Sequence, residues 1–376
     1  MKFRVDRDVL AEAVAWTARS LPTRPAVPVL SGVLIEAGDD GTLTVSSFDY
    51  DVSARCEVPA TVTFAGVVVV PGKMLADIAK ALPPKPVDVE LDGTRLTITC
   101  GASRFALHSM PTEDYPALPE PPETAGTIES SVFSQAVMQV TAAASRDETL
   151  PLLTGVRVEI EGDTMTLMAT DRYRLAMKEV SWSPNSPGFS DVALVRARTL
   201  IDVAKSMSAG ESIEIALGTE TGKQIIGFDA SGKATTSQLI EGAYPPVRRL
   251  FPDETPTYAV VKTDELVEAA RRVSLVAERN TPVRLAFTEG QVVLEAGQGD
   301  DAQASEAVEC AFTGEDITTA FNPHLFLDGL TVMGTQWVRL GFTHPAKPVL
   351  ISGLKSESPE DQDNFLYLLM PNRFVS

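Results

Sequence analysis

The segment "ATDRYRLAM", which begins at Ala169, places Arg172 and Arg174 on either side of Tyr173. An arginine presents five N–H donors in a planar fork, so this group suits the binding of carboxylates and peptide carbonyls rather than covalent chemistry. The opposing interpretation is structural: Arg174 pairs with a carboxylate of the chain itself, and Leu175 belongs to the core. On these residues alone the structural interpretation is favoured.

Groups for catalysis do not converge in the sequence. It contains no G-x-S-x-G elbow and no H-E-x-x-H pair. The histidines and cysteines are scattered, with no C-x-x-C pair: His108, His324, His344, Cys56, Cys100 and Cys310. We therefore predict a protein that is not an enzyme, has no cofactor and binds no metal, with its thiols in the reduced state.

Composition sets the class of protein. The 376 residues suit two to four soluble domains, and 32 basic against 51 acidic residues give a net charge of −19. That charge argues against nonspecific binding to nucleic acid or membranes, but it does not exclude such binding, because local charge distribution sets the field. The first 16 residues contain no apolar signal-peptide core, and the longest apolar run, "GVVVVPG", is too short to span a bilayer. We expect a cytoplasmic protein.

The chain repeats itself three times. "VPGKMLADIAKAL" begins at Val70, "VRARTLIDVAKSM" at Val195 and "FNPHLFLDGLTVM" at Phe321, at successive offsets of 125 and 126 residues. Each repeat also begins with a helical apolar stripe, for which the sequence offers Asp6, Ser130 and Thr263 as caps, followed by alternating segments typical of β-strands. The pattern predicts three α+β domains, joined by proline-rich linkers, with the bounds 1–122, 127–252 and 256–376.

This layout, together with "TLMATDRYRLA", "EGAYPPVRRLFP" and "LYLLMP", resembles the bacterial sliding clamps, the β subunits of DNA polymerase III holoenzyme, in the actinobacterial style. The resemblance covers the chain from Met1 to about Phe374. It implies three tandem clamp domains with helices inside and antiparallel sheets outside, closed by a second copy into a head-to-tail homodimeric ring. Such a ring encircles and slides on duplex DNA and makes the polymerase processive.

A DNA path through the ring would reconcile the acidic total with a nucleic-acid partner, provided that basic residues line the hole. Arg24 lies in "LPTRPAVPVL", which matches the family's DNA-contacting loop. The candidates on or beside the predicted helices are Arg24, Lys73, Lys80, Arg146, Arg196, Arg198, Lys205, Arg271 and Arg279. For each of them, the alternative is an ordinary solvated helix face.

The resemblance also implies a groove between the second and third domains for short linear peptides of the QL-x-L-F type. Its partners would be the polymerase III α subunit, the clamp loader, other polymerases, mismatch-repair proteins and ligase. The matching positions are Leu153, Thr170, Arg172, Tyr173, Arg174, Leu175, Pro245, Arg249, Leu250, Leu368, Met370, Pro371, Asn372, Arg373 and Phe374. Asn372 stands where many members have an apolar residue, and Arg172 and Tyr173 replace smaller or different residues of some members, which puts partner preference in doubt.

Dimer contacts are expected between a first-domain edge, "SRFALHS", and the third domain of the second copy. The expected residues are Arg104, Phe105, Leu107, Leu275, Val276, Asp300, Asp301 and Glu306. Two alternatives stay open: a specialised second clamp copy, and a monomeric tandem-domain scaffold that binds peptides but never encircles DNA. A hydrolase of unrecognised type is a third and weaker alternative.

Overall fold

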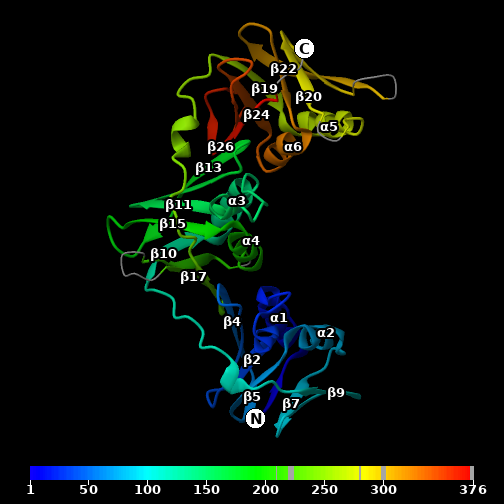
Figure 1. Cartoon of the computed structure of the whole chain (residues 1–376), viewed down its shortest axis with the longest axis vertical. Helices are drawn as coiled ribbons and strands as arrows, with labels where there is room; N and C mark the ends of the chain where they lie inside the picture. Colours follow the sequence, from blue (N-terminus) through cyan, green and yellow to red (C-terminus); the bar gives the residue numbers. More distant parts are fainter. Residues whose placement is uncertain (209, 219–223, 279–280, 298–301, 373–376) are drawn as a thin grey trace. The chain divides into compact units, whose positions relative to one another are not determined.

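A computed structural model describes residues 1–208, 210–218, 224–278, 281–297 and 302–372 (Figure 1). Within these ranges the predicted pair of helices is present in every repeat. The helices are α1 (Arg7–Thr17), α2 (Gly72–Ala81), α3 (Ser130–Thr141), α4 (Ala197–Ser206), α5 (Thr263–Ser274) and α6 (Pro323–Thr331). A short strand, which the sequence patterns did not predict, precedes the first helix of each repeat.

The predicted helix caps are confirmed only in part. The Asp6 carboxylate accepts from the backbone N–H groups of Asp8 and Val9, as an N-cap should. Ser130 and Thr263 are already the first helical residues, and their buried hydroxyls make no hydrogen bond. These two predictions were wrong because a hydroxyl just before an apolar stripe can equally point into the core.

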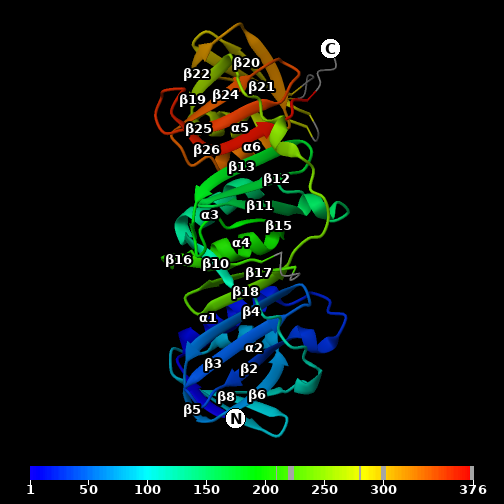
Figure 2. The same ribbon diagram turned by 90° about the vertical axis from the view of Figure 1, so that its left-hand side faces the viewer.

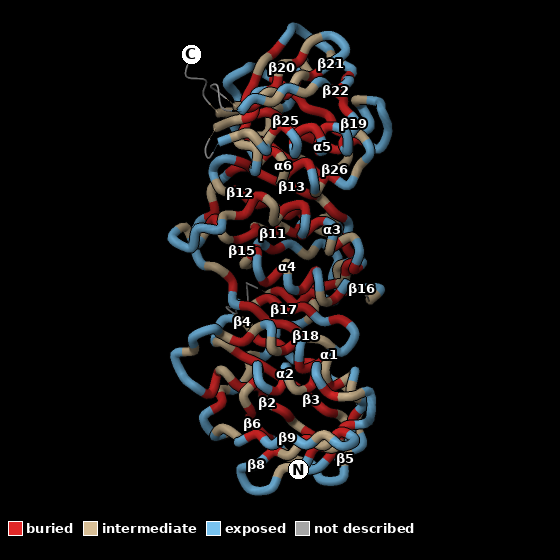
Figure 3. Tube along the Cα trace, turned by 90° about the vertical axis from the view of Figure 1, so that its right-hand side faces the viewer, coloured by how far each residue is buried: buried red, intermediate tan, exposed pale blue. Residues whose placement is uncertain are grey.

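The first compact unit comprises Met1–Ser130, Ser183–Pro187 and Lys205–Leu239, and contains two antiparallel sheets. The smaller sheet has the order β5 (Thr61–Phe64), β1 (Lys2–Val5), β7 (Val87–Asp92), β8 (Arg95–Cys100), β9 (Ser103–His108). The larger has the order β14 (Ser183–Pro184), β10 (Thr124–Glu129), β16 (Ser212–Ala216), β17 (Ile225–Ala230), β18 (Lys233–Gln238), β4 (Val52–Pro59), β3 (Thr42–Phe48), β2 (Gly32–Ala37), β6 (Gly66–Pro71). Figure 3 shows buried residues along β17 and β18, while the loops are exposed.

The second compact unit contains the remaining residues and one antiparallel sheet that passes from the second repeat into the third. Figure 2 shows β26 beside β13, where the two repeats join. The order is β15 (Ser190–Arg196), β11 (Gly155–Glu161), β12 (Thr164–Thr170), β13 (Arg174–Ser181), β26 (Gln362–Leu369), β25 (Val349–Leu354), β24 (Trp337–Phe342), β19 (Thr257–Lys262), β22 (Ala304–Thr313), β21 (Gln291–Ala296), β20 (Val283–Thr288), β23 (Ile317–Phe321).

Three sequence repeats therefore form two compact units. The sheet of the first repeat continues into the second through β4 and β18, and the sheet of the second continues into the third through β13 and β26. The central repeat is shared, because each of its two groups of strands pairs with a different neighbour. The boundary between the two compact units consequently falls inside the central repeat and not in the proline-rich linkers.

Candidate functional site

The residues Asp171–Tyr173 form a tight turn between β12 and β13 rather than the middle of a strand. The Asp171 carboxylate accepts from the backbone N–H groups of Tyr173 at 3.0 Å and Arg174 at 3.1 Å. The Thr170 hydroxyl donates to the Arg174 carbonyl and accepts from the backbone N–H of Arg172. These bonds hold Arg172 at φ 80°, a left-handed conformation that is uncommon outside glycine. We call Thr170–Arg174 the Asp171 turn.

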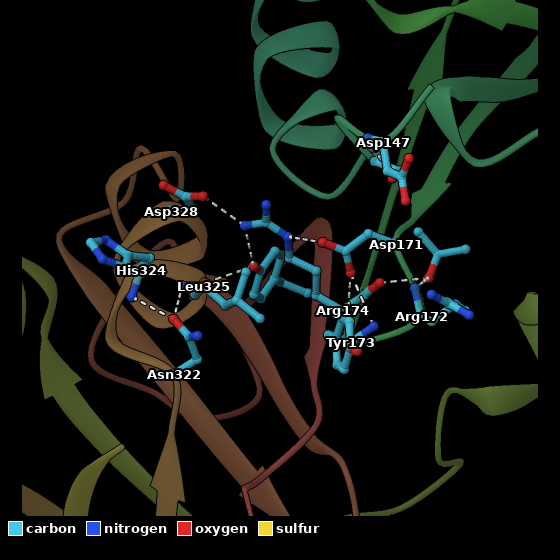
Figure 4. Close-up of polar contacts among 12 residues, drawn as sticks. Asp147, Asp171, Arg172, Tyr173, Arg174, Asn322, His324, Leu325 and Asp328 are labelled. Carbon is cyan, nitrogen blue, oxygen red and sulfur yellow. Dashed lines mark hydrogen bonds and ion pairs between the residues drawn. The ribbon is translucent and has the colours of Figure 1, made fainter. Parts of the chain in front are cut away.

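Arg174 is buried, and it does not line a surface as the resemblance implied. Its guanidinium donates to Asp171 at 2.9 Å and to Asp328 of α6 at 2.8 Å, as Figure 4 shows. It also donates to the Tyr367 hydroxyl, which in turn donates to the Leu325 carbonyl. Burial alone would lower the pKa of Arg174, but Tyr367, Asp328 and Asp171 together raise it. Arg174 therefore anchors the turn against α6 and β26, and the structural interpretation was correct for this residue.

An apolar cluster lies under the Asp171 turn. Its buried members are Leu153, Leu175, Leu194, Tyr244, Val247, Leu350 and Leu368. The Tyr244 hydroxyl accepts from the backbone N–H of Thr170, which links the cluster to the turn. Burial raises the pKa of Tyr244 to about 12, so this hydroxyl stays protonated at neutral pH. The predicted groove residues Leu153, Leu175 and Leu368 are thus brought together as a floor.

Three large apolar side chains from different segments stay exposed near this floor. Tyr173 is 60% exposed, Leu250 is 57% exposed and Met370 is 44% exposed. The Met370 backbone N–H donates to the Tyr173 carbonyl at 2.9 Å, so two of these segments lie side by side. Exposed apolar side chains above a buried apolar floor suit a ligand that brings apolar anchors of its own. We call Tyr173, Leu250 and Met370 the apolar rim.

The other predicted groove residues lie around this rim. Pro245, Pro371 and Asn372 are half-buried, and the Asn372 backbone N–H donates to the Ala320 carbonyl. Arg172 and Arg249 are exposed. Arg373 and Phe374 lie outside the described residues.

Arg248, which the sequence did not single out, pairs with Glu179 at 2.8 Å and with Glu159 at 3.6 Å. Its neighbour Arg249 has no ion pair among the described residues. The two arginines of "VRRL", in the short helix Val247–Leu250, therefore differ in environment: Arg248 is paired with two glutamates, and Arg249 is exposed without a described ion-pair partner. Because Arg248 and Arg249 are identical neighbours in the chain, the sequence alone could not show which of them is paired.

Among the DNA candidates, six are exposed and have no ion pair with a described residue. These are Arg24, Lys73, Lys80, Arg146, Arg198 and Lys205. Arg19, which is not among the candidates, is similarly exposed just after α1. Arg198 is exposed on α4, Arg196 is half-buried at the end of β15, and Arg271 pairs with Glu268 at 2.7 Å. Arg279 lies outside the described residues.

Basic residues are not spread evenly over the helices. Exposed lysine or arginine is found on α2 and α4, the second helices of the first two repeats. Helix α5 interleaves Arg271 and Arg272 with Glu268, and the described exposed residues of α3 are uncharged. Among the described α-helical residues, the exposed cations without an ion pair therefore lie on α2 and α4, whereas those of α5 are paired with Glu268.

The predicted dimer residues fall into two groups. Arg104 and Phe105 are exposed on β9, an edge strand, and Leu275 is 83% exposed beside the half-buried Val276. Leu107, which was predicted as a dimer contact, is by contrast buried in the chain's own core. Glu306 pairs with Arg272 at 2.6 Å within the chain. Asp300 and Asp301 lie outside the described residues.

The fold agrees with comparisons against known proteins. Family models for the N-terminal, central and C-terminal domains of the DNA polymerase III β subunit match residues 1–119, 127–246 and 248–373. The chain belongs to this family of β sliding clamps, as the sequence resemblance predicted, and it consists of three tandem clamp domains.

Relatives cover the whole chain. The β sliding clamp of Streptomyces coelicolor is 53% identical over 374 residues, covering 99% of each chain. The crystal structure of the sliding clamp from Bacillus subtilis matches with a TM-score of 0.91 at 27% identity, covering 100% of both chains. A sliding clamp from Pseudomonas aeruginosa bound to griselimycin matches with a TM-score of 0.91 at 25% identity, again over 100% of both chains. Within the described residues, no helix is long and apolar enough to cross a membrane.

Proposed function

We propose that this chain is a DNA polymerase processivity factor, a non-catalytic subunit that forms a homodimeric ring around duplex DNA in the cytoplasm. Family membership supports the class of function, and the pairing of strands between repeats supports the ring. The domains would have the bounds 1–122, 127–252 and 256–376. A clamp loader would open the ring, because the sequence lacks the phosphate-binding pattern G-x-x-x-x-G-K-[ST].

The observation that carries the ring is a strand pairing that occurs at both junctions between repeats. At the first junction, β18 pairs antiparallel with β4 from Lys233–Cys56 to Ser237–Val52. At the second, β26 pairs antiparallel with β13 over five residue pairs. β18 and β26 are the last strands of the second and third repeats. Their partners, β4 and β13, occupy equivalent positions in the preceding repeats: each is the third strand after the first helix of its repeat.

The same rule leaves one strand of each kind without such a partner among the described residues. The last strand of the first repeat, β9, pairs only with β8, and the segment Ala304–Glu309 of β22 pairs only with β21. A second copy would supply each missing partner, and a twofold axis would form both contacts at once and close the chain ends into a ring. Phe105 and Leu275 would then be covered by the partner.

The charge pattern supports DNA inside the ring. The chain is acidic overall at −19, yet the exposed cations on α2 and α4 and in the loop at Arg24 are concentrated in particular segments. Duplex DNA carries about one negative charge per 1.7 Å, so a local basic lining attracts it even when the total charge is negative. Because contacts to phosphates read no sequence, the ring would slide.

The apolar rim and its floor support a partner-peptide groove. We propose that linear peptides with leucine and phenylalanine anchors bind there, from the polymerase α subunit, the clamp loader, other polymerases, mismatch-repair proteins and ligase. Methionine and tyrosine at a rim adapt to varied apolar shapes, which suits a site shared by several partners. The groove residues would be those of the rim and floor with Thr170, Arg172, Pro245, Arg249, Pro371 and Asn372.

Two measurements test the proposal. Native mass spectrometry should give a species near twice 40.3 kDa, and the double variant Phe105→Asp with Leu275→Asp should give the monomer. After loading, the parent should stay on nicked circular DNA and leave the same DNA once it is linearised. A parent chain that is monomeric, or that is retained equally on circular and linear DNA, would contradict the ring.

A further inference from the structure

The side chain at the tip of the Asp171 turn is not needed for the turn itself. The bonds that shape the turn come from Thr170, Asp171 and Arg174, and only the backbone of Arg172 takes part. At φ 80° glycine would fit with less steric cost than arginine. A non-glycine residue held in this region by its surroundings is a reason to look for a role of its side chain.

Of the four described arginines near the groove, two are neutralised from within the chain, whereas Arg172 and Arg249 are exposed and have no ion pair with a described residue. Arg174 is paired with Asp171 and Asp328, and Arg248 with Glu179 and Glu159. Arg172 is exposed and has no ion pair within 4.0 Å among the described residues. Its charge acts on Asp147 without an ion pair: the pKa of Asp147 is lowered mainly by hydrogen bonds from Thr149 and to a lesser degree by Arg172 (Figure 4).

Arg172 is also adjacent in the chain to the apolar rim. Tyr173, a member of the rim, is the next residue, and its carbonyl accepts a hydrogen bond from the backbone N–H of Met370, another member. Arg172 is therefore directly bonded to the rim segment. In Figure 4, Arg172 and the guanidinium of Arg174 lie on opposite sides of the turn. An uncompensated cation beside exposed apolar side chains favours a ligand that combines apolar anchors with a negative charge.

We propose that Arg172 makes the groove selective for peptides that carry an aspartate or glutamate next to their apolar anchors. This inference rests on the proposed groove, and it adds a charge preference that the apolar floor cannot supply. The contact is solvent-exposed, so the preference should be modest and should weaken as salt is added. Selection at such a rim ranks competing partners rather than deciding whether they bind.

The test compares two peptides that share leucine and phenylalanine anchors and differ only by aspartate against asparagine beside them. We expect the parent to bind the aspartate peptide about two- to five-fold more tightly at low salt, the scale of an exposed ion pair. Arg172→Gly should bring this ratio close to one, because the aspartate peptide loses more affinity than the asparagine peptide. Arg172→Lys should retain most of the ratio, and Arg248→Ala, whose arginine is already paired, should retain all of it.

The outcomes separate this inference from the function on which it rests. If both peptides bind and Arg172→Gly keeps the parent's ratio, Arg172 does not select charge, and the groove stands. If neither peptide binds the parent protein, the groove itself fails and the inference fails with it. A ratio near one in the parent also overturns the inference. Calorimetry at two salt concentrations supplies all of these values.

Discussion

Among the described residues, the same turn geometry occurs between β3 and β4 and between β12 and β13, with different surroundings in the two places. Between β3 and β4, the Asp49 carboxylate accepts from the backbone N–H groups of Asp51 and Val52, as Asp171 does for Tyr173 and Arg174. The residue between is left-handed in both turns, with φ 74° at Tyr50 and 80° at Arg172. We call Asp49–Val52 the Asp49 turn.

The strands that follow the two turns differ in what they pair with. After the Asp171 turn, Leu175 lies opposite Leu368 of β26, within the apolar cluster. After the Asp49 turn, Ser53 lies opposite Thr236 of β18, and the two buried hydroxyls are hydrogen-bonded to each other. A hydroxyl pair fills its own hydrogen-bonding needs and offers no floor for a leucine anchor.

The comparison teaches that backbone geometry alone does not make the site. The two repeats have equivalent turns. The side chains that face each other on the paired strands next to each turn are apolar beside the Asp171 turn and polar beside the Asp49 turn. If this is correct, each chain has a single peptide site. Variants at corresponding positions of the two turns should then have unequal effects.

The largest effect, on folding stability, is expected from Arg174→Val, which gives the last residue of the Asp171 turn the identity that it has in the Asp49 turn. Val52 occupies this position in the first turn, but Asp171 and Asp328 would lose the buried cation that pairs with both of them. Removing one partner of a buried ion pair costs about 3 kcal/mol or more. The free energy of unfolding, from urea titration, should fall by this amount.

A matched control distinguishes the contribution of the buried Arg174 cation to stability from that of its carboxylate partner Asp328. Asp328→Asn should cost less, because the Asp328 side chain is 41% exposed and Asp171 stays paired. Unfolding of Arg174→Val at the same urea concentration as the parent would show that Arg174 does not anchor the turn.

The second expected effect is on peptide binding at the apolar rim. Met370→Ala and Tyr173→Ala should each weaken a leucine–phenylalanine peptide about ten-fold, since either change removes exposed apolar surface worth about 1.4 kcal/mol. Tyr50→Ala, at the other turn, should leave the affinity unchanged although Tyr50 is also exposed. Calorimetry should give one site per chain. Two sites, or loss of binding in Tyr50→Ala, would refute the contrast between the turns.

The third expected effect is on the salt dependence of DNA binding, which should respond to the DNA candidates and not to residues of the turns. Arg24→Ala combined with Lys205→Ala should lower the slope of log K against log salt by about 1.8, since each lost phosphate contact removes about 0.9. Arg271→Ala should change the slope less, because Arg271 is paired with Glu268. Groove variants should not change it. An unchanged slope in the double variant would mean that these two residues lie away from the DNA.

Much of this architecture could be predicted from the sequence, because repeat spacing and apolar periodicity depend on local order along the chain. The separate roles of Arg172 and Arg174 could not. Two residues apart on a strand they would share a face, but the left-handed step at Arg172 puts them on opposite sides of the turn. One of the two carboxylates that pair with Arg174, that of Asp328, is 154 positions away, and no local pattern predicts it.

The burial of Leu107 escaped prediction for a related reason. Alternation along β9 marks one face of a strand, and it does not say whether that face meets the chain's own core or a second copy. Phe105 and Leu107 alternate correctly, yet only Phe105 is exposed. Which side chains an edge strand leaves uncovered depends on the neighbouring elements, and those are known only once the fold is complete.

The smallest predicted effect concerns the polar residue at the end of the groove. Asn372 is half-buried, and its backbone N–H is fixed to the Ala320 carbonyl, so a substitution changes the side chain without releasing the segment. Asn372→Val should add apolar contact beside Met370 and tighten peptide binding by up to about 1 kcal/mol, the scale of burying a small apolar group. Asn372→Ser, a polar control, should leave the affinity close to that of the parent. Calorimetry with a neutral peptide avoids any contribution from Arg172. If Asn372→Val binds no more tightly than Asn372→Ser, the side chain at this position does not reach the peptide, and the groove ends at Met370.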